Sequence, residues 1–305
     1  MSVFVSYSHA QAPWVRTRLV PCLKAGGVDV RIDVERFRAG IAVHRQMDAE
    51  QDACDKHLLI LSDEYLASAA CRHEMERAIA RDPAFDGGTI IPVRRMPCTL
   101  PPGIAIPNPL HIDLTDDGQP AAWERLLADC GASLGTTALE WLRARDAIVR
   151  HLGDERSVNL VTREGVKTRA WEALIEDARQ TVGDLPRVDF QDTAVYSRPG
   201  LVRQMLAALG LRVPVPNRPD DLSALGHALA AGAPRWLALT RFHLVQDHAD
   251  LDKELFLVLR DLVQEKKHLR VLVQSRTPFA NLLPPLPVGS DFELPVVDLR
   301  GSQRI

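Results

Sequence analysis

The chain has 305 residues, of which 46% are hydrophobic and 25% charged, with a formal net charge of −3. This composition is typical of a globular protein and excludes a disordered or fibrous one. The near-neutral charge gives no direct signal for nucleic acid or an anionic membrane, and the length predicts two domains.

No apolar run approaches the roughly 20 residues that span a bilayer, and the N-terminal residues lack the basic segment of a signal peptide. We therefore expect a cytoplasmic protein without a membrane segment. The cysteines are irregularly spaced and form no C-x-x-C pair, so we expect free thiols and no metal site. They are Cys22, Cys54, Cys71, Cys98 and Cys130.

The first half alternates short apolar runs with amphipathic stretches, which predicts βαβ units around a parallel sheet buried on both faces. The expected strands are residues 3–7, 28–33, 58–62, 89–93 and 110–114. The expected helices are residues 12–25, 42–53, 70–80 and 120–127, while five prolines in 97–109 predict a loop without regular helix.

Small and polar residues follow at 131–137, before an expected helix over 137–152. We place the boundary near residue 135. This gives a first domain over 1–135 and a second, also α/β, over 136–305.

One carboxylate in the first domain has an informative position. The segment from Ser62 to Glu74 follows the third expected strand and leads into a helix. In open α/β sheets, ligands bind outside the carboxyl ends of the parallel strands. Glu74 is therefore a candidate functional residue.

Four segments of the first half match a known family in the same order. Residues 3–9 (VFVSYSH) match its first box, residues 33–40 its BB loop, residues 58–66 its third strand and turn, and residues 90–93 its fourth strand. The first half thus resembles a bacterial TIR (Toll/interleukin-1 receptor) domain. The resemblance implies a flavodoxin-like sheet of about five parallel strands.

The resemblance also implies two possible activities. Some TIR domains cleave NAD, as a substrate and not a cofactor, between nicotinamide and ribose, whereas others are adaptors that only assemble. In the cleaving members a glutamate follows a tryptophan by four residues. Here the glutamate position is Glu74, and Ala70 occupies the tryptophan position.

A single carboxylate suits this reaction. Breaking the N-glycosidic bond develops oxocarbenium charge, which a carboxylate beside the ribose stabilises. Nicotinamide is a cationic leaving group and needs no general acid. The alternative is a solvated glutamate that complements the charge of its helix start.

Other positions are candidates for substrate binding. Tyr7 and Ser8 end the first strand at the ligand-binding edge, or they only shape the turn. Phe37 in the BB-like loop could cover a nucleotide while Arg38 contacts its phosphates, or Phe37 serves self-association. Ala70 is included as the position of the missing tryptophan.

The second half contains a segment that resembles a degenerate phosphate-binding loop of the AAA-like and STAND ATPases. Gly165, Lys167 and Thr168 follow the pattern, but Val166 replaces the final glycine that lets backbone N–H groups approach phosphate. The second apolar strand, residues 235–242, lacks a terminal acidic pair for Mg²⁺. We predict no ATP hydrolysis and a role in assembly or regulation, with nucleotide binding alone as the alternative.

Three functional hypotheses follow. The first is a TIR effector that cleaves NAD when assembled through TIR self-association, in bacterial antiviral defence or toxin signalling. The second is a non-enzymatic adaptor that binds another TIR protein or a sensor protein through the BB loop. The third, an ATP-driven switch, is opposed by Val166 and by the missing acidic pair.

Overall fold

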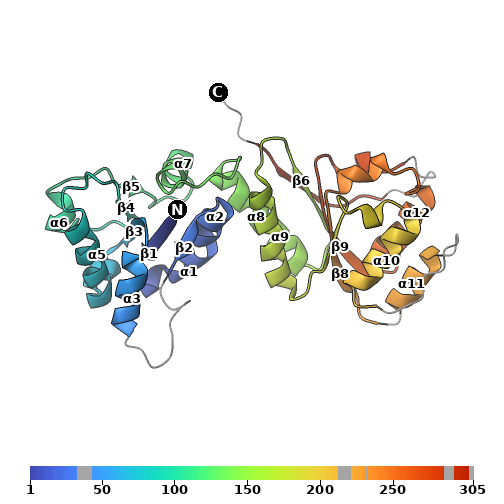
Figure 1. The fold of residues 1–305 in the computed structure, drawn as a ribbon, viewed down its shortest axis with the longest axis horizontal. Coiled ribbons are helices and arrows are strands. Elements are labelled where there is room, and N and C mark those ends of the chain that lie inside the picture. The colour runs from blue at the N-terminus through green and yellow to red at the C-terminus, as the bar shows by residue number, and fades with distance from the viewer. Residues whose placement is uncertain (33–42, 212–220, 231, 285–291, 302–305) are drawn as a thin grey trace. The chain divides into compact units, whose positions relative to one another are not determined.

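The computed structural model describes residues 1–32, 43–211, 221–230, 232–284 and 292–301, and the predicted BB loop at 33–40 lies outside them. The chain divides into two compact units (Figure 1). Unit 1 comprises residues 1–142 and 167–173, and unit 2 comprises residues 143–166 and 174–305.

Unit 1 contains a five-stranded, wholly parallel sheet in the order β2-β1-β3-β4-β5. Its strands are β1 (Ser2–Ser6), β2 (Asp29–Arg31), β3 (Lys56–Leu61), β4 (Ile90–Arg94) and β5 (Ile112–Asp113). The order 2-1-3-4-5 is that of flavodoxin-like folds, so the predicted fold class is confirmed. In such a sheet the strand order reverses between β1 and β3, and ligands bind at this point.

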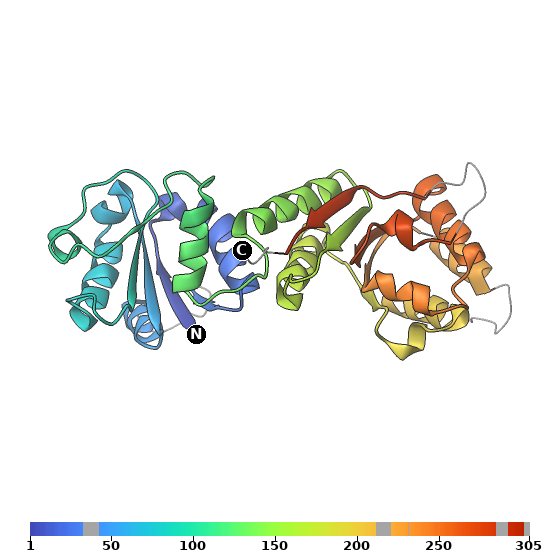
Figure 2. The same ribbon diagram turned by 90° about the horizontal axis from the view of Figure 1, so that it is seen from above.

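Helices cover both faces of this sheet (Figure 2). They are α1 (Ala12–Trp14), α2 (Val20–Ala25), α3 (Val43–Asp52), α4 (Asp63–Ala67), α5 (Ala69–Arg81), α6 (Pro102–Ala105) and α7 (Pro120–Asp129). The Trp14 and Trp123 rings, 5.9 Å apart, bring α1 and α7 together. The carboxylate of Asp52 accepts from Arg77 and joins α3 to α5.

Proline explains two departures from the expected helices. The helix over 12–25 contains a π-helical turn, Val15–Leu19, just before Pro21. Pro21 has no N–H and its ring crowds the carbonyl four residues earlier, so the regular ladder is broken there. The prediction that 97–109 contains no regular helix is wrong, because Pro102 opens the short α6 at a position where proline is tolerated.

Two serines divide the segment that contains Glu74. The Ser62 hydroxyl accepts the N–H of Tyr65 at 3.1 Å and begins α4. The Ser68 hydroxyl accepts the N–H of Cys71 at 3.3 Å and begins α5. These N-caps favour two helices in place of one, so Glu74 lies in the second turn of a properly capped α5.

Unit 2 contains a second five-stranded parallel sheet, in the order β10-β6-β9-β8-β7. Its strands are β6 (Val158–Thr162), β7 (Arg187–Asp189), β8 (Arg235–Thr240), β9 (Leu269–Ser275) and β10 (Val296–Leu299). Its helices are α10 (Arg198–Ala208), α11 (Asp221–Ala230) and α12 (Lys253–Arg260), with short turns at Thr193–Val195, Phe242–Asp247, Phe279–Leu282 and Asp261–Glu265. Helices α8 (Ala138–Gly153) and α9 (Thr168–Val182) each contain residues of both units.

Aromatic rings fill the core of unit 2. Phe242 contacts Phe190 at 4.9 Å and Phe279 at 5.1 Å between ring centroids, and all three are buried. Contacts of this kind add to the free energy of burial. They join β7 to the turns after β8 and β9, so the carboxyl side of this sheet is tightly packed.

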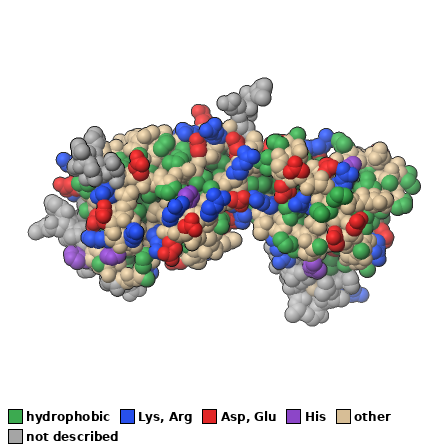
Figure 3. Space-filling model, turned by 180° about the vertical axis from the view of Figure 1, so that it is seen from behind, with side chains coloured by type: hydrophobic (Ala, Val, Ile, Leu, Met, Phe, Trp, Pro, Cys, Tyr) green, Lys and Arg blue, Asp and Glu red, His purple; other side chains and the backbone are tan. Residues whose placement is uncertain are grey.

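The surface charges, the cysteines and the lengths of the helices can be compared with what the composition predicts. Acidic and basic side chains are mixed over the face of each unit seen in Figure 3. All five cysteines are free, as their spacing predicts; four are buried and Cys98 is half-buried. In the part of the chain that the structure describes, no helix is long and apolar enough to cross a membrane.

Candidate functional site at the carboxyl edge of the unit 1 sheet

Glu74 lies at the carboxyl end of β1, close to the point between β1 and β3 where the strand order reverses. Its helix α5 follows β3, and its side chain reaches Ser6, the last residue of β1. Only 5% of Glu74 is exposed. A glutamate that merely complemented its helix start would be solvated, so this alternative does not fit.

The hydroxyl of Ser6 binds the carboxylate of Glu74, and the hydroxyl of Tyr65 binds Ser6. Ser6 Oγ donates to Glu74 Oε2, and Ser6 Oγ also lies 2.8 Å from Tyr65 Oη. Ser6 and Tyr65 are 1% and 0% exposed. A buried carboxylate is costly unless it accepts hydrogen bonds. Ser6 on β1 supplies one directly, and Tyr65 on α4 bonds to Ser6 behind it.

Gln51 holds the backbone of the same residue. Its side-chain amide donates to the carbonyl of Glu74 at 2.7 Å, and His57 Nε2 lies 3.0 Å from the carbonyl of Gln51. Gln51 is on α3, so two elements besides α5 position Glu74. Burial lowers the pKa of His57 below its ordinary value.

The two predicted residues at the end of β1 are close to α5. Tyr7 and Ser8 are both buried, at 6% and 5% exposure. The thiol of Cys71 lies 3.5 Å from the carbonyl of Tyr7, and Arg16 donates to the Tyr7 hydroxyl at 3.4 Å. The Ser8 hydroxyl is buried with no hydrogen-bond partner among the described residues.

The other predicted substrate contacts differ in position. Ala70 is exposed in the first turn of α5, four residues before Glu74 and so on the same side of the helix. A large side chain at 70 therefore has room on the surface of α5. Phe37 and Arg38 lie outside the described residues.

Three residues that the sequence analysis did not predict contribute to this site. Ser6, Tyr65 and Gln51 were not predicted to have roles. The first two lie inside recognised segments, and the alternation of strand residues could not show that Ser6 reaches Glu74. Gln51 is 23 residues from Glu74 along the chain, and no local pattern marks it.

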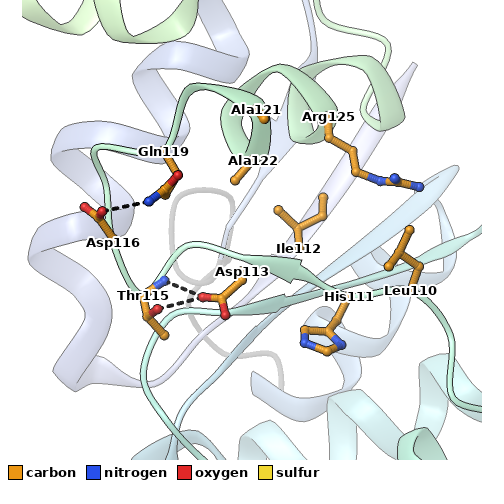
Figure 4. Close-up of a pocket in the computed structure, with 10 residues that line it drawn as sticks. All are labelled: Leu110, His111, Ile112, Asp113, Thr115, Asp116, Gln119, Ala121, Ala122 and Arg125. Carbon is orange, nitrogen blue, oxygen red and sulfur yellow. Dashed lines mark hydrogen bonds between the residues drawn. The ribbon is translucent and has the colours of Figure 1, made fainter.

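A separate pocket of about 640 Å³ lies between the edge strand β5 and α7 (Figure 4). It is lined by Leu110, His111, Ile112, Asp113, Thr115, Asp116, Gln119, Ala121, Ala122 and Arg125. Hydrogen bonds from Thr115, at 3.0 and 2.7 Å, and an ion pair with Arg94 hold the pKa of the Asp113 carboxyl well below its usual range. Leu110 is 66% exposed at the rim, so this edge of the sheet presents an apolar side chain to solvent.

The predicted phosphate loop lies between β6 and α9. Gly165 has a left-handed φ of +91°, and Lys167 and Thr168 are exposed at the start of α9. The N–H of Lys167 donates to the carbonyl of Leu134 at 2.9 Å. The strand–loop–helix order is as expected, but this N–H, which a phosphate loop would offer to its ligand, already has a partner.

Other backbone groups of the chain bond to this loop or lie against it. The N–H of Arg163 donates to Leu299 at 2.9 Å, and that of Val166 to Arg163 at 3.4 Å. Gly301 lies against the loop, since a Cβ on it would be only 2.0 Å from the carbonyl oxygen of Glu164. These contacts take up backbone groups that phosphate would need.

Side chains at the carboxyl edge of the unit 2 sheet pair with one another. Strand β8 ends in Thr240, and Arg241 after it forms an ion pair with Asp189. Gln274 accepts the N–H of Arg241 at 2.8 Å and donates to Thr162 at 2.7 Å. Thr240 and Arg241 thus stand where the predicted resemblance to ATPases would require acidic residues.

These observations define unit 1 as a flavodoxin-like α/β domain with a buried carboxylate at its ligand-binding edge. Residues 3–127 match a family model described as TIR domain. The N-terminal region of this chain is therefore a TIR domain, which supports a role in signalling, and TIR domains generally associate with themselves or with other TIR proteins.

Two solved structures are similar to parts of the chain. The TIR domain of the Toll-related receptor TRR-2 from Hydra magnipapillata is 19% identical, with 42% of this chain and 96% of that chain covered and a TM-score of 0.37. NtrX from Brucella abortus in complex with ATP is 13% identical, with 98% of this chain and 68% of that chain covered and a TM-score of 0.32. No curated protein matches the chain. At these TM-scores the family match alone identifies the domain.

Proposed function

We propose that the TIR domain cleaves NAD at the bond between nicotinamide and ribose when the protein is assembled, with Glu74 as the catalytic carboxylate. The observation that supports this most is the burial of Glu74 at the carboxyl end of β1 with its oxygen bound by Ser6. A carboxylate kept out of water exerts a stronger field on developing positive charge than a solvated one.

The reaction needs only one carboxylate. The bond between ribose C1′ and the pyridinium nitrogen breaks, and its electron pair leaves with neutral nicotinamide. Glu74 stabilises the oxocarbenium charge that develops. Water then adds to C1′ and loses a proton, which gives ADP-ribose, unless an internal nucleophile of the ADP-ribose adds and gives a cyclised product.

The test is nicotinamide release from NAD by the purified full-length chain at high concentration, with and without a crowding agent. Glu74→Gln keeps the shape of the side chain, and we expect it to reduce the rate about 10²- to 10³-fold, as for loss of one transition-state electrostatic group. The matched control is Glu64→Gln, since Glu64 is an exposed carboxylate on the neighbouring α4. Absence of release under every assembling condition, or full activity of Glu74→Gln, would contradict the proposal.

The second candidate is a TIR adaptor that binds other TIR proteins through its BB loop. Two observations favour it: Ala70 replaces an aromatic wall beside Glu74, and the exposed Leu110 rims the pocket at the sheet edge. Association that also uses this edge of the sheet should weaken in Leu110→Asp, measured by light scattering at a series of concentrations. An adaptor would associate normally as Glu74→Gln and release no nicotinamide.

For unit 2 we propose a role in assembly or regulation without ATP hydrolysis. The occupied N–H groups of the loop and the Asp189–Arg241 ion pair support this. Isothermal titration with Mg·ATP, with Lys167→Ala as comparison, tests it. Phosphate release would contradict it, and saturable binding that Lys167→Ala abolishes would favour the alternative of nucleotide binding alone.

A further inference from the structure

Three buried side chains form a chain of hydrogen bonds behind the site. Tyr65 Oη lies 2.8 Å from Ser6 Oγ, which bonds in turn to Glu74 Oε2. The three come from α4, β1 and α5. Their side chains are at most 5% exposed, so water does not compete well for these bonds.

The direction of the chain follows from the donor inventory. A carboxylate only accepts, and a serine hydroxyl has one proton. Ser6 therefore donates to Glu74 and accepts from Tyr65. Burial raises the pKa of Tyr65 well above its ordinary value, so its phenol keeps the proton that it donates. Successive bonds of this kind polarise one another toward the carboxylate.

We infer that Ser6 and Tyr65 are positioning residues that keep Glu74 ionised and fix the direction of its carboxylate toward the ribose. This inference rests on the proposed function of Glu74. A hydrogen bond to the charged form favours ionisation, whereas burial opposes it. Without Ser6, burial would act on Glu74 with less opposition.

Other titratable groups lie on the elements around Glu74. They are Tyr7 after β1, Tyr65 with Asp63 and Glu64 on α4, Cys71, His73 and Arg77 on α5, Asp48, Glu50 and Asp52 on α3, and His57 on β3. Several of these pair with one another: His73 and Arg77 with Asp48, and Arg77 with Asp52. The hydroxyl of Ser6 contacts Glu74 directly, which is why it is the group to remove.

The test compares the pH profiles of nicotinamide release for wild type, Ser6→Ala and Tyr65→Phe. We expect the acid limb of kcat/KM to move to higher pH by about one to two units in Ser6→Ala, because a charge-assisted hydrogen bond is lost, and by less in Tyr65→Phe. Ser6→Thr keeps the hydroxyl and should restore the wild-type limb. A role in packing alone would lower thermal stability and leave the limb in place.

Ser275→Ala is the matched control. Ser275 is a buried serine of unit 2 whose hydroxyl also bonds at both ends, to Asn159 at 3.0 Å and to Thr277 at 2.6 Å. Its removal should lower stability and leave the acid limb unchanged. If Ser6→Ala fails to fold, Tyr65→Phe carries the same test, since it removes one oxygen and keeps the ring.

A readout without turnover separates this inference from the proposed function. Carboxyl ¹³C NMR of glutamate-labelled protein, with Glu74 assigned through Glu74→Gln, should show its titration at higher pH in Ser6→Ala. That shift in a protein that releases no nicotinamide would contradict the proposed function and support the positioning. An active wild type whose acid limb and Glu74 titration are the same in both variants would overturn the inference.

Discussion

The carboxyl edges of the two parallel sheets differ in how their polar side chains are satisfied. In unit 2, Gln274 bridges Arg241 and Thr162, and Arg241 pairs with Asp189. In unit 1, by contrast, the hydroxyl of Ser6 binds the buried carboxylate of Glu74.

The two units share the architecture of a parallel sheet, and the difference at their carboxyl edges shows that this architecture alone does not determine a function. The carboxyl edge of an open parallel sheet is a general place for ligands, but a fold does not imply a function. At the edge of unit 2 the polar side chains bond to one another within the domain. The edge of unit 1 keeps a buried carboxylate, whose desolvation is costly, at the place where such sheets bind ligands.

Asn159→Ala should have the largest effect on stability, and it tests whether the buried polar contacts of the unit 2 sheet are structural. The Asn159 amide donates to the Val273 carbonyl at 2.9 Å and accepts the N–H of Phe279 at 2.8 Å. Its loss leaves buried groups without partners, which costs about 2–3 kcal/mol. Urea unfolding measures this. A change under about 0.5 kcal/mol, the usual limit for surface substitutions, would contradict the structural role.

Gly301→Ala tests the occupied loop of unit 2. The added Cβ would be 2.0 Å from the Glu164 carbonyl oxygen, so backbone must shift at a cost of about 1–3 kcal/mol. Gly226→Ala is the control, since Gly226 lies within α11 and no atom of the described residues lies within 4 Å of a new Cβ. There alanine should stabilise by about 0.5–1 kcal/mol. Equal thermal shifts for the two variants would contradict this close packing.

Ala70→Trp sharpens the comparison from the side of unit 1. An aromatic ring one helical turn before Glu74 would cover the carboxylate and supply a surface for the substrate ring, with stacking of about 0.5–1.5 kcal/mol. We expect kcat/KM for nicotinamide release to rise about 3- to 10-fold. Ala80→Trp, at another exposed alanine of α5, should leave it unchanged. No gain from Ala70→Trp would favour the adaptor hypothesis.

The sequence predicted the parts of this fold that depend on strong local patterns. The buried strands of unit 1 and the helix with Glu74 follow from hydrophobic periodicity and from recognised segments. Strand β7 has only three residues, and α10 begins with Arg198, Pro199 and Gly200, so neither gives a clear local signal. The site is a similar case. Glu74 belongs to a sequence motif, but its partners Ser6 and Gln51 come from elements that only the tertiary fold brings to it.

The smallest expected effect concerns acid stability and compares a buried histidine of unit 1 with a half-buried histidine of unit 2. Burial lowers the pKa of His57, and burial with the nearby Arg276 lowers that of His243. The unfolded chain then binds more protons than the folded one below about pH 6.5, so stability present above that pH is lost as the pH falls. One such group contributes at most about 1.4 kcal/mol per pH unit.

His57 is 2% exposed and His243 only half-buried, so His57→Gln should flatten the acid dependence of stability more than His243→Gln. Hydrogen exchange of each unit at pH 7.5 and 5.5 measures both slopes, and a larger flattening from His243→Gln would show that burial is not what sets the order.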